Sequence, residues 1–144
     1  MNPSRQVYTL YIRTTPARLW KAITQGSQTR AFYFGMALKA ELRTGAPLQY
    51  ADAKGNVPIR GKILEVKRLK RLVHTFEFRH QKWATTRVAY TLEKDGPTVK
   101  LTLVHDRLDK SPGTALDVGS GWPLILSGLK TLLETGKTLF PAAS

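Results

Sequence analysis

The sequence of 144 residues predicts an α+β fold in which a curved, seven-stranded antiparallel sheet wraps around one long C-terminal helix. The first observation is a period of two in the apolar residues from Met36 to His105, broken by short turn signals, as in a meander of antiparallel strands. The second is a helical stripe of leucine and isoleucine after Trp122, which needs a broad apolar surface to cover it.

The N-terminal part of the chain predicts one strand followed by two short helices. The alternation over Gln6–Arg13 predicts a strand with both faces partly covered. Thr15 supplies an N-cap oxygen, and the proline after it fits the first helical position, so a helix should begin there and close at Gly26 in a left-handed conformation. A second helix is expected over Ser27–Phe34.

Six further strands are expected between the turns. Their bounds are Met36–Leu42, Pro47–Ala51, Val57–Val66, Leu72–Arg79, Ala84–Glu93 and Thr98–His105. In the last three strands the alternation predicts one polar face and one apolar face. The apolar face holds Leu72, His74, Phe76, Phe78, Val88, Tyr90, Leu92, Val99, Leu101, Leu103 and His105.

The last helix is predicted to begin at Gly121 and to end at Gly136. Residues 106–120 are expected to form a loop because they contain Pro112 and several flexible or capping residues. Pro123 should lie in the first helical turn, since a proline deeper in a helix costs roughly 3 kcal/mol. The stripe consists of Trp122, Ile125, Leu126, Leu129, Leu132 and Leu133, and we expect it to pack on the apolar face of the sheet.

Composition narrows the class of protein. The length fits a single domain over residues 1–144, and the absence of cysteine excludes disulfides, thiolate nucleophiles and Cys-ligated metals. The sequence start lacks the pattern of a signal peptide, and no run of apolar residues is long enough to span a membrane, so we expect a cytoplasmic protein. A net charge of +13 favours anionic partners without choosing among them.

Several motifs, in chain order from Tyr8 to Gly136, resemble those of the AHSA-type family, named after an activator of a heat-shock-protein ATPase. They are YIRTTPARLWKAIT, TRAFYFG, RGKILEV, RLVHTFEF, VKLTLVHD and GWPLILSGLKTLLETG, of which the last is the most specific. The family lies within the START-like or SRPBCC superfamily of helix-grip folds. The resemblance implies a cavity between sheet and helix, and the superfamily includes lipid and hormone carriers, aromatase/cyclases and oxygenase ligand domains. The family name also implies a link to chaperones and stress response.

The first functional hypothesis is a non-catalytic protein that binds a small apolar or amphipathic molecule between the sheet and the last helix. The aromatic side chains of the apolar face would line such a pocket, and plain core packing is the alternative. The expected ligand-binding residues are Phe34, Tyr50, His74, Phe76, Phe78, Tyr90, Leu103, His105, Trp122, Ile125, Leu126 and Leu129. No cofactor is expected.

A second hypothesis is a cavity enzyme of the cyclase or hydrolase type that uses His74, Tyr90 and His105 as acid–base groups. Buried histidines satisfied by hydrogen bonds are the plainer interpretation. The three histidines of the chain have neither the spacing of metal ligands nor paired carboxylates nearby, so no metal site is expected. The sequence also lacks a nucleophile elbow and a phosphate-binding glycine loop.

A third hypothesis is an interaction module for a chaperone or another acidic protein. It rests on a basic cluster around one predicted turn, formed by Lys62, Lys67, Arg68, Lys70 and Arg71. The plainer interpretation is that these residues form a charged turn exposed to solvent. No recognition helix or RNA-binding aromatic strand accompanies the cluster, so specific binding of nucleic acid is disfavoured.

Overall fold

A computed structural model describes residues 4–140 of the chain. The elements in order are β1 (Gln6–Ile12), α1 (Pro16–Thr24), α2 (Gly26–Thr29), β2 (Ala37–Ala40), β3 (Pro47–Ala51), β4 (Ile59–Lys67), β5 (Arg71–Phe78), β6 (Thr86–Asp95), β7 (Thr98–Asp106), the single 3₁₀ turn η1 (Leu108–Lys110) and α3 (Pro112–Thr135). Each predicted strand is present, with ends displaced by at most two residues. None of the helices within residues 4–140 is long and apolar enough to cross a membrane.

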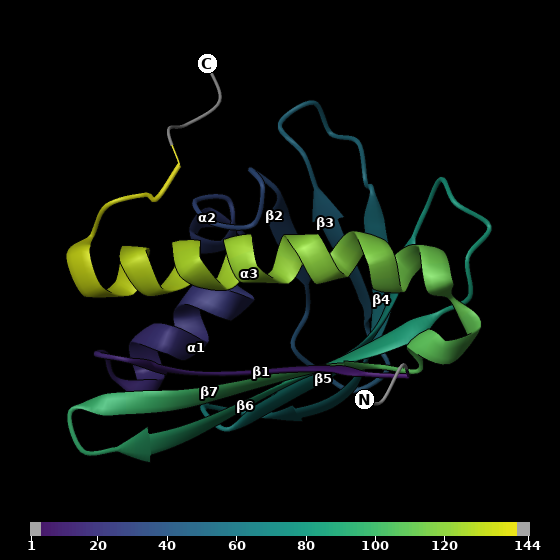
Figure 1. Cartoon of the computed structure of the whole chain (residues 1–144). Coiled ribbons are helices and arrows are strands. Elements are labelled where there is room, and N and C mark those ends of the chain that lie inside the picture. The colour runs from purple at the N-terminus through teal and green to yellow at the C-terminus, as the bar shows by residue number, and fades with distance from the viewer. Residues whose placement is uncertain (1–3, 141–144) are drawn as a thin grey trace.

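The seven strands form one antiparallel sheet in the order β1-β7-β6-β5-β4-β3-β2. Figure 1 shows the sheet curving, with β1, β6 and β7 below α3 in that view and β2 to β4 rising behind it. Helix α3 runs across the concave side, and α1 lies near its C-terminal half. The predicted fold class, a curved sheet around a long C-terminal helix, is confirmed.

The concave face of the sheet is the apolar face that the alternation predicted. His74, Val88 and His105 have no exposed surface, and along β7 buried residues alternate with half-buried ones. The first strand is present, but the prediction that both of its faces are partly covered was wrong. Val7 and Tyr11 are each 48% exposed, and only the other face of β1 is covered. The first strand lies at the edge of the sheet, where an outward face meets solvent.

Helix α3 begins nine residues earlier than the sequence predicted, at Pro112 rather than Gly121, and residues 112–120 are helical instead of forming a loop. Thr114 and Val118 continue the buried stripe at intervals of four residues before Trp122, so packing against the sheet extends the helix upstream. Pro123 therefore lies inside the helix, on its exposed side. The apolar contacts of the stripe offset the cost of roughly 3 kcal/mol that a proline brings to a helix interior.

The region after α1 also differs from the prediction. Helix α2 covers only Gly26–Thr29, and Gly26 begins it instead of closing α1. A Cβ atom at Gly26 would lie 2.6 Å from the carbonyl oxygen of Leu38, so glycine is required there by the close approach of β2. The hydroxyl of Thr29 accepts a hydrogen bond from the Leu38 amide at 2.9 Å, which fixes α2 on the start of β2.

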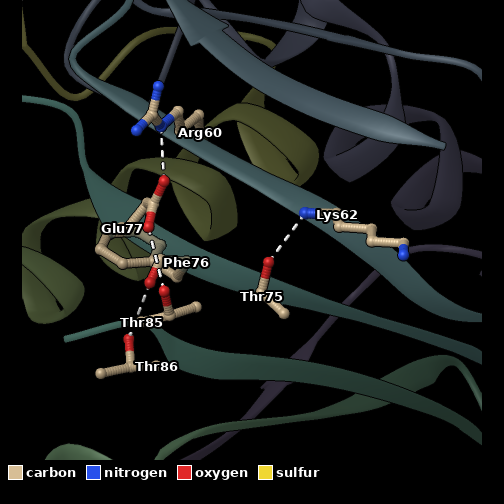
Figure 2. Close-up of polar contacts among 7 residues, drawn as sticks. All are labelled: Arg60, Lys62, Thr75, Phe76, Glu77, Thr85 and Thr86. Atoms are coloured by element: carbon tan, nitrogen blue, oxygen red, sulfur yellow. Dashed lines mark hydrogen bonds and ion pairs between the residues drawn. The ribbon is translucent and has the colours of Figure 1, made fainter. Parts of the chain in front are cut away.

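Strand β4 is bent against β5, and this bend helps to curve the sheet. The pairing shifts by one residue between Ile63 and Glu65, which is a β-bulge. Two residues before the bulge, the Lys62 amide donates to the hydroxyl of Thr75 at 2.8 Å (Figure 2). A Cβ atom at Gly61 would lie 1.9 Å from the backbone oxygen of Thr75, so the strands can approach this closely only with glycine at position 61.

We predict that Gly61→Ala lowers the free energy of unfolding by about 1–3 kcal/mol, because the added methyl group forces β4 and β5 apart. Gly119→Ala is the matched control. Its Cβ atom would lie 3.4 Å from the flexible side chain of Gln6, and alanine in a helix interior is worth up to about 1 kcal/mol over glycine. Urea unfolding measures both; an unchanged midpoint for Gly61→Ala would contradict the close-approach argument.

Candidate functional site

A pocket of about 200 Å³, partly open to solvent, lies between the first half of α3 and one end of the sheet. Its walls come from α3, from the adjoining ends of β4 and β5, and from the turn that follows α2. The lining residues are Tyr33, Phe34, Met36, Pro58, Ile59, Phe76, Phe78, Asp117, Val118, Gly121, Trp122 and Ile125. Five of the twelve are aromatic, and Asp117 is the single charged one, so the surface offered to an occupant is overwhelmingly apolar.

The strand and helix patterns explain why these side chains meet. Phe76 and Phe78 lie on the same face of β5, and their rings are 5.1 Å apart in an edge-to-face arrangement. Val118, Trp122 and Ile125 follow one another at helical spacing on α3. Phe34, 55% exposed and with a positive φ of 51°, lies beside Gly121, where a side chain on the helix would touch its ring.

Of the twelve residues predicted to bind a ligand, five line this pocket: Phe34, Phe76, Phe78, Trp122 and Ile125. The other seven, Tyr50, His74, Tyr90, Leu103, His105, Leu126 and Leu129, are buried in the core between α3 and the sheet. Asp117 and Val118 were missed because their segment was expected to be a loop. The signal that could have found them is Val118, four residues before Trp122.

His105 joins α3 to three strands through a chain of hydrogen bonds. The Trp122 indole Nε1 donates to His105 Nδ1 at 3.0 Å. Because an indole nitrogen can only donate, Nδ1 is the acceptor and the neutral ring carries its proton on Nε2. Nε2 then donates to the Thr86 hydroxyl at 2.7 Å, which donates to the Phe76 carbonyl at 3.2 Å (Figure 2 shows this last bond).

The buried environment of His105 keeps its ring uncharged. Burial, together with the nearby His74, lowers the pKa of His105 to about 3, although Asp106 acts in the opposite direction. Both ring nitrogens are occupied by protein groups, so His105 has no free site at which to accept a proton from a substrate. The plainer of the two interpretations, a buried histidine satisfied by hydrogen bonds, describes this residue.

His74 has a different environment, among tyrosines. Its Nδ1 lies 2.7 Å from the carbonyl oxygen of Thr75, so Nδ1 carries the proton and Nε2 is an acceptor. Burial lowers the pKa of His74 to about 4. Tyr33 stacks on Tyr50 with ring centres 4.2 Å apart, and Tyr90 lies on the other side of His74. Burial raises the pKa of Tyr50 to about 12, so this cluster is neutral at physiological pH.

The basic cluster predicted from the sequence surrounds the turn between β4 and β5. Arg71 is paired there with Glu65 at 3.0 Å and donates to the hydroxyl of Thr91. The other four members, Lys62, Lys67, Arg68 and Lys70, are exposed. Within residues 4–140 no group of three or more acidic, histidine or cysteine side chains is placed to hold a metal ion.

The sheet, the long helix across its concave side and the pocket beside that helix define a helix-grip protein. The family model described as "Activator of Hsp90 ATPase homolog 1-like protein" matches residues 13–134, and the chain belongs to this family. The family resemblance seen in the sequence motifs is thereby confirmed. None of the curated proteins matches the chain.

Solved structures show the same fold at low sequence identity. DynU16, a protein in the dynemicin biosynthetic locus, superposes with a TM-score of 0.80 at 19% identity, covering 95% of this chain and 49% of its own. CalU16 from Micromonospora echinospora has a TM-score of 0.74 at 20% identity, covering 92% and 77%. An HSP90 activator from Plasmodium falciparum has a TM-score of 0.74 at 18% identity, covering 90% and 96%. The chain thus spans about half the length of DynU16.

We predict that Thr86→Val, which keeps the side-chain shape, lowers the free energy of unfolding by about 1–3 kcal/mol, because it leaves the His105 Nε2–H buried without an acceptor. Thr102→Val on the half-buried, convex face of β7 is the control and should change stability by less than about 0.5 kcal/mol. Equal stability of the two variants in urea unfolding would show that the hydrogen-bond chain contributes little.

The two buried histidines should also make stability depend on pH. Their pKa values in the folded protein, about 4 and about 3, lie below the value of roughly 6.5 in an unfolded chain. Between these values the unfolded state binds more protons, so the free energy of unfolding is highest above about pH 6.5 and falls as the pH drops toward 4.

For His74 alone this loss amounts to about 3 kcal/mol, at roughly 1.4 kcal/mol per pH unit. His74→Phe should therefore flatten the pH profile of urea unfolding between pH 7 and 4. His80→Phe, in an exposed turn, should retain the slope of the unmodified protein. Parallel profiles for all three proteins would mean that His74 is not buried in its neutral form.

Proposed function

We propose that this protein is a non-catalytic binding protein for a small apolar or amphipathic molecule, held in the pocket between α3 and the sheet. The observation that carries the proposal is the volume of about 200 Å³ lined by five aromatic rings. Ligand pockets in proteins are typically concave and mostly apolar, with a few polar groups that orient the ligand. Here Asp117 on α3 is the charged group of the lining.

The size of the pocket limits the ligand. Pockets for drug-sized molecules usually enclose about 300–1,000 Å³, and this one is smaller. A water molecule occupies about 30 Å³ in the liquid, so the pocket accommodates on the order of seven to ten non-hydrogen atoms. A single substituted aromatic ring has this size, and its faces and edges complement the surrounding Phe76, Phe78 and Trp122 side chains.

The proposal predicts that a substituted benzene such as 4-ethyltoluene binds saturably and raises the melting temperature in a concentration-dependent way, since a ligand of the native state stabilises it. Gly121→Leu should abolish the effect by filling the pocket. Ser120→Leu, at the neighbouring exposed position, should leave binding intact. Titration calorimetry and thermal unfolding measure both, and the absence of binding by a panel of substituted benzenes would overturn the proposal.

The enzyme hypothesis has less support from the geometry. His74, Tyr90 and His105 do not line the pocket, and His105 has both nitrogens occupied by protein groups. The net charge of +13 and the exposed basic residues at the β4–β5 turn support a second candidate function, the binding of an acidic protein partner such as a chaperone. That function would use the surface of the sheet and not the pocket.

A further inference from the structure

Two fully buried polar atoms at the centre of the molecule have no hydrogen-bond partner within residues 4–140. They are the hydroxyl oxygen of Tyr50 and Nε2 of His74. The hydroxyls of Tyr33 and Tyr90 lie near enough to Tyr50 to influence its pKa, but neither makes a well-aligned hydrogen bond with it. Buried polar groups of native proteins nearly always find partners, so two exceptions in one cluster need an explanation.

The two atoms are chemically complementary. His74 uses Nδ1–H toward the Thr75 carbonyl, so Nε2 presents a lone pair. Tyr50 presents a hydroxyl that can donate, and burial keeps it protonated. The two ring centres lie 6.5 Å apart with the ring planes inclined by 50°, so the two groups belong to neighbouring side chains.

The pair lies directly behind the pocket. Tyr50 is opposite Ile59 in the β3–β4 pairing, and His74 lies two residues before Phe76 on the same face of β5; Ile59 and Phe76 both line the pocket. Tyr33 lines the pocket and its ring stacks on that of Tyr50, so one side chain touches both the pocket and the pair. A ligand in the pocket would reach the pair by displacing this ring.

We propose that Tyr50 and His74 form a polar subsite that binds a neutral hydroxyl group at the inner end of the ligand, an inference that rests on the proposed binding function. A hydroxyl group accepts from Tyr50 and donates to His74, which satisfies both atoms. A carboxylate would place negative charge against the Nε2 lone pair. An ammonium group would lose its hydration without gaining a counter-charge. The ligand class is therefore a small phenol or aromatic alcohol.

Water has the same donor and acceptor chemistry, so the test must separate a bound water from a ligand hydroxyl. The probes are 4-ethylphenol, its isostere 4-ethyltoluene, and 4-ethylbenzoate, each measured by titration calorimetry. We expect 4-ethylphenol to bind at least about tenfold more tightly than 4-ethyltoluene, because a site built to hydrogen-bond a hydroxyl discriminates against a ligand without one. The carboxylate should bind most weakly.

Variants test which residues cause the preference for 4-ethylphenol over 4-ethyltoluene. Tyr50→Phe removes only the unpartnered hydroxyl and His74→Phe removes the acceptor, and each should reduce the phenol preference to about onefold while 4-ethyltoluene still binds. Tyr8→Phe is the matched control, since its hydroxyl donates to Gln6 at 3.0 Å away from the pocket lining; it should keep the full preference. If His74→Phe does not fold, Tyr50→Phe alone decides the question.

The outcomes separate this inference from the function on which it rests. If none of the probes binds, the proposed function itself fails. If 4-ethyltoluene and 4-ethylphenol bind equally well, or the preference survives Tyr50→Phe, the pocket binds ligands but the polar subsite is wrong. A crystal structure of the phenol complex gives the last distinction: the phenol oxygen between Tyr50 and His74 supports the inference, and a water molecule there overturns it.

Discussion

The hydrogen-bond chain from Trp122 through His105 and Thr86 to the Phe76 carbonyl is the interaction on which the arrangement depends. Apolar packing holds α3 against the sheet but is non-directional, so by itself it permits the helix to slide or rotate. The hydrogen-bond chain specifies one position of α3 on the sheet, because each of its members meets its partner only in that position. It connects α3 to β7, β6 and β5 in turn, across the centre of the concave face.

The pocket is a consequence of that fixed position. Trp122 is held by His105 on one side and presents its ring to Tyr33 and Tyr90 in edge-to-face contacts, so it cannot swing into the open space. Beside it, Gly121 brings no side chain to the interface, and Phe34 reaches over the gap from the turn after α2. The space of about 200 Å³ therefore remains where the helix stripe and the sheet face do not meet.

The sequence predicted the sheet and the helix well because both signals are repeated many times along the chain. Period-two alternation in β5 to β7 and the leucine stripe after Trp122 each involve several residues, so one irregular position does not hide them. The extent of α3 was missed for a local reason: Pro112, Pro123 and the nearby glycines oppose a helix by their intrinsic preferences. Tertiary contacts at the buried positions Thr114 and Val118 outweigh these preferences and make the segment helical. Two of the pocket-lining residues, Asp117 and Val118, were missed for the same reason, since they lie in that segment.

The two histidines show what periodicity cannot predict. His74 and His105 occupy equivalent places in the pattern, both on the apolar face of a central strand, and both are fully buried. Their chemistry differs because of residues far away in the sequence: His105 is opposite a tryptophan of α3, while His74 has its free nitrogen among Tyr50 and Tyr90. A satisfied histidine stabilises the fold, whereas an unsatisfied one costs free energy until something binds to it. Of the two, His74 is therefore the residue whose presence a structural role alone does not explain.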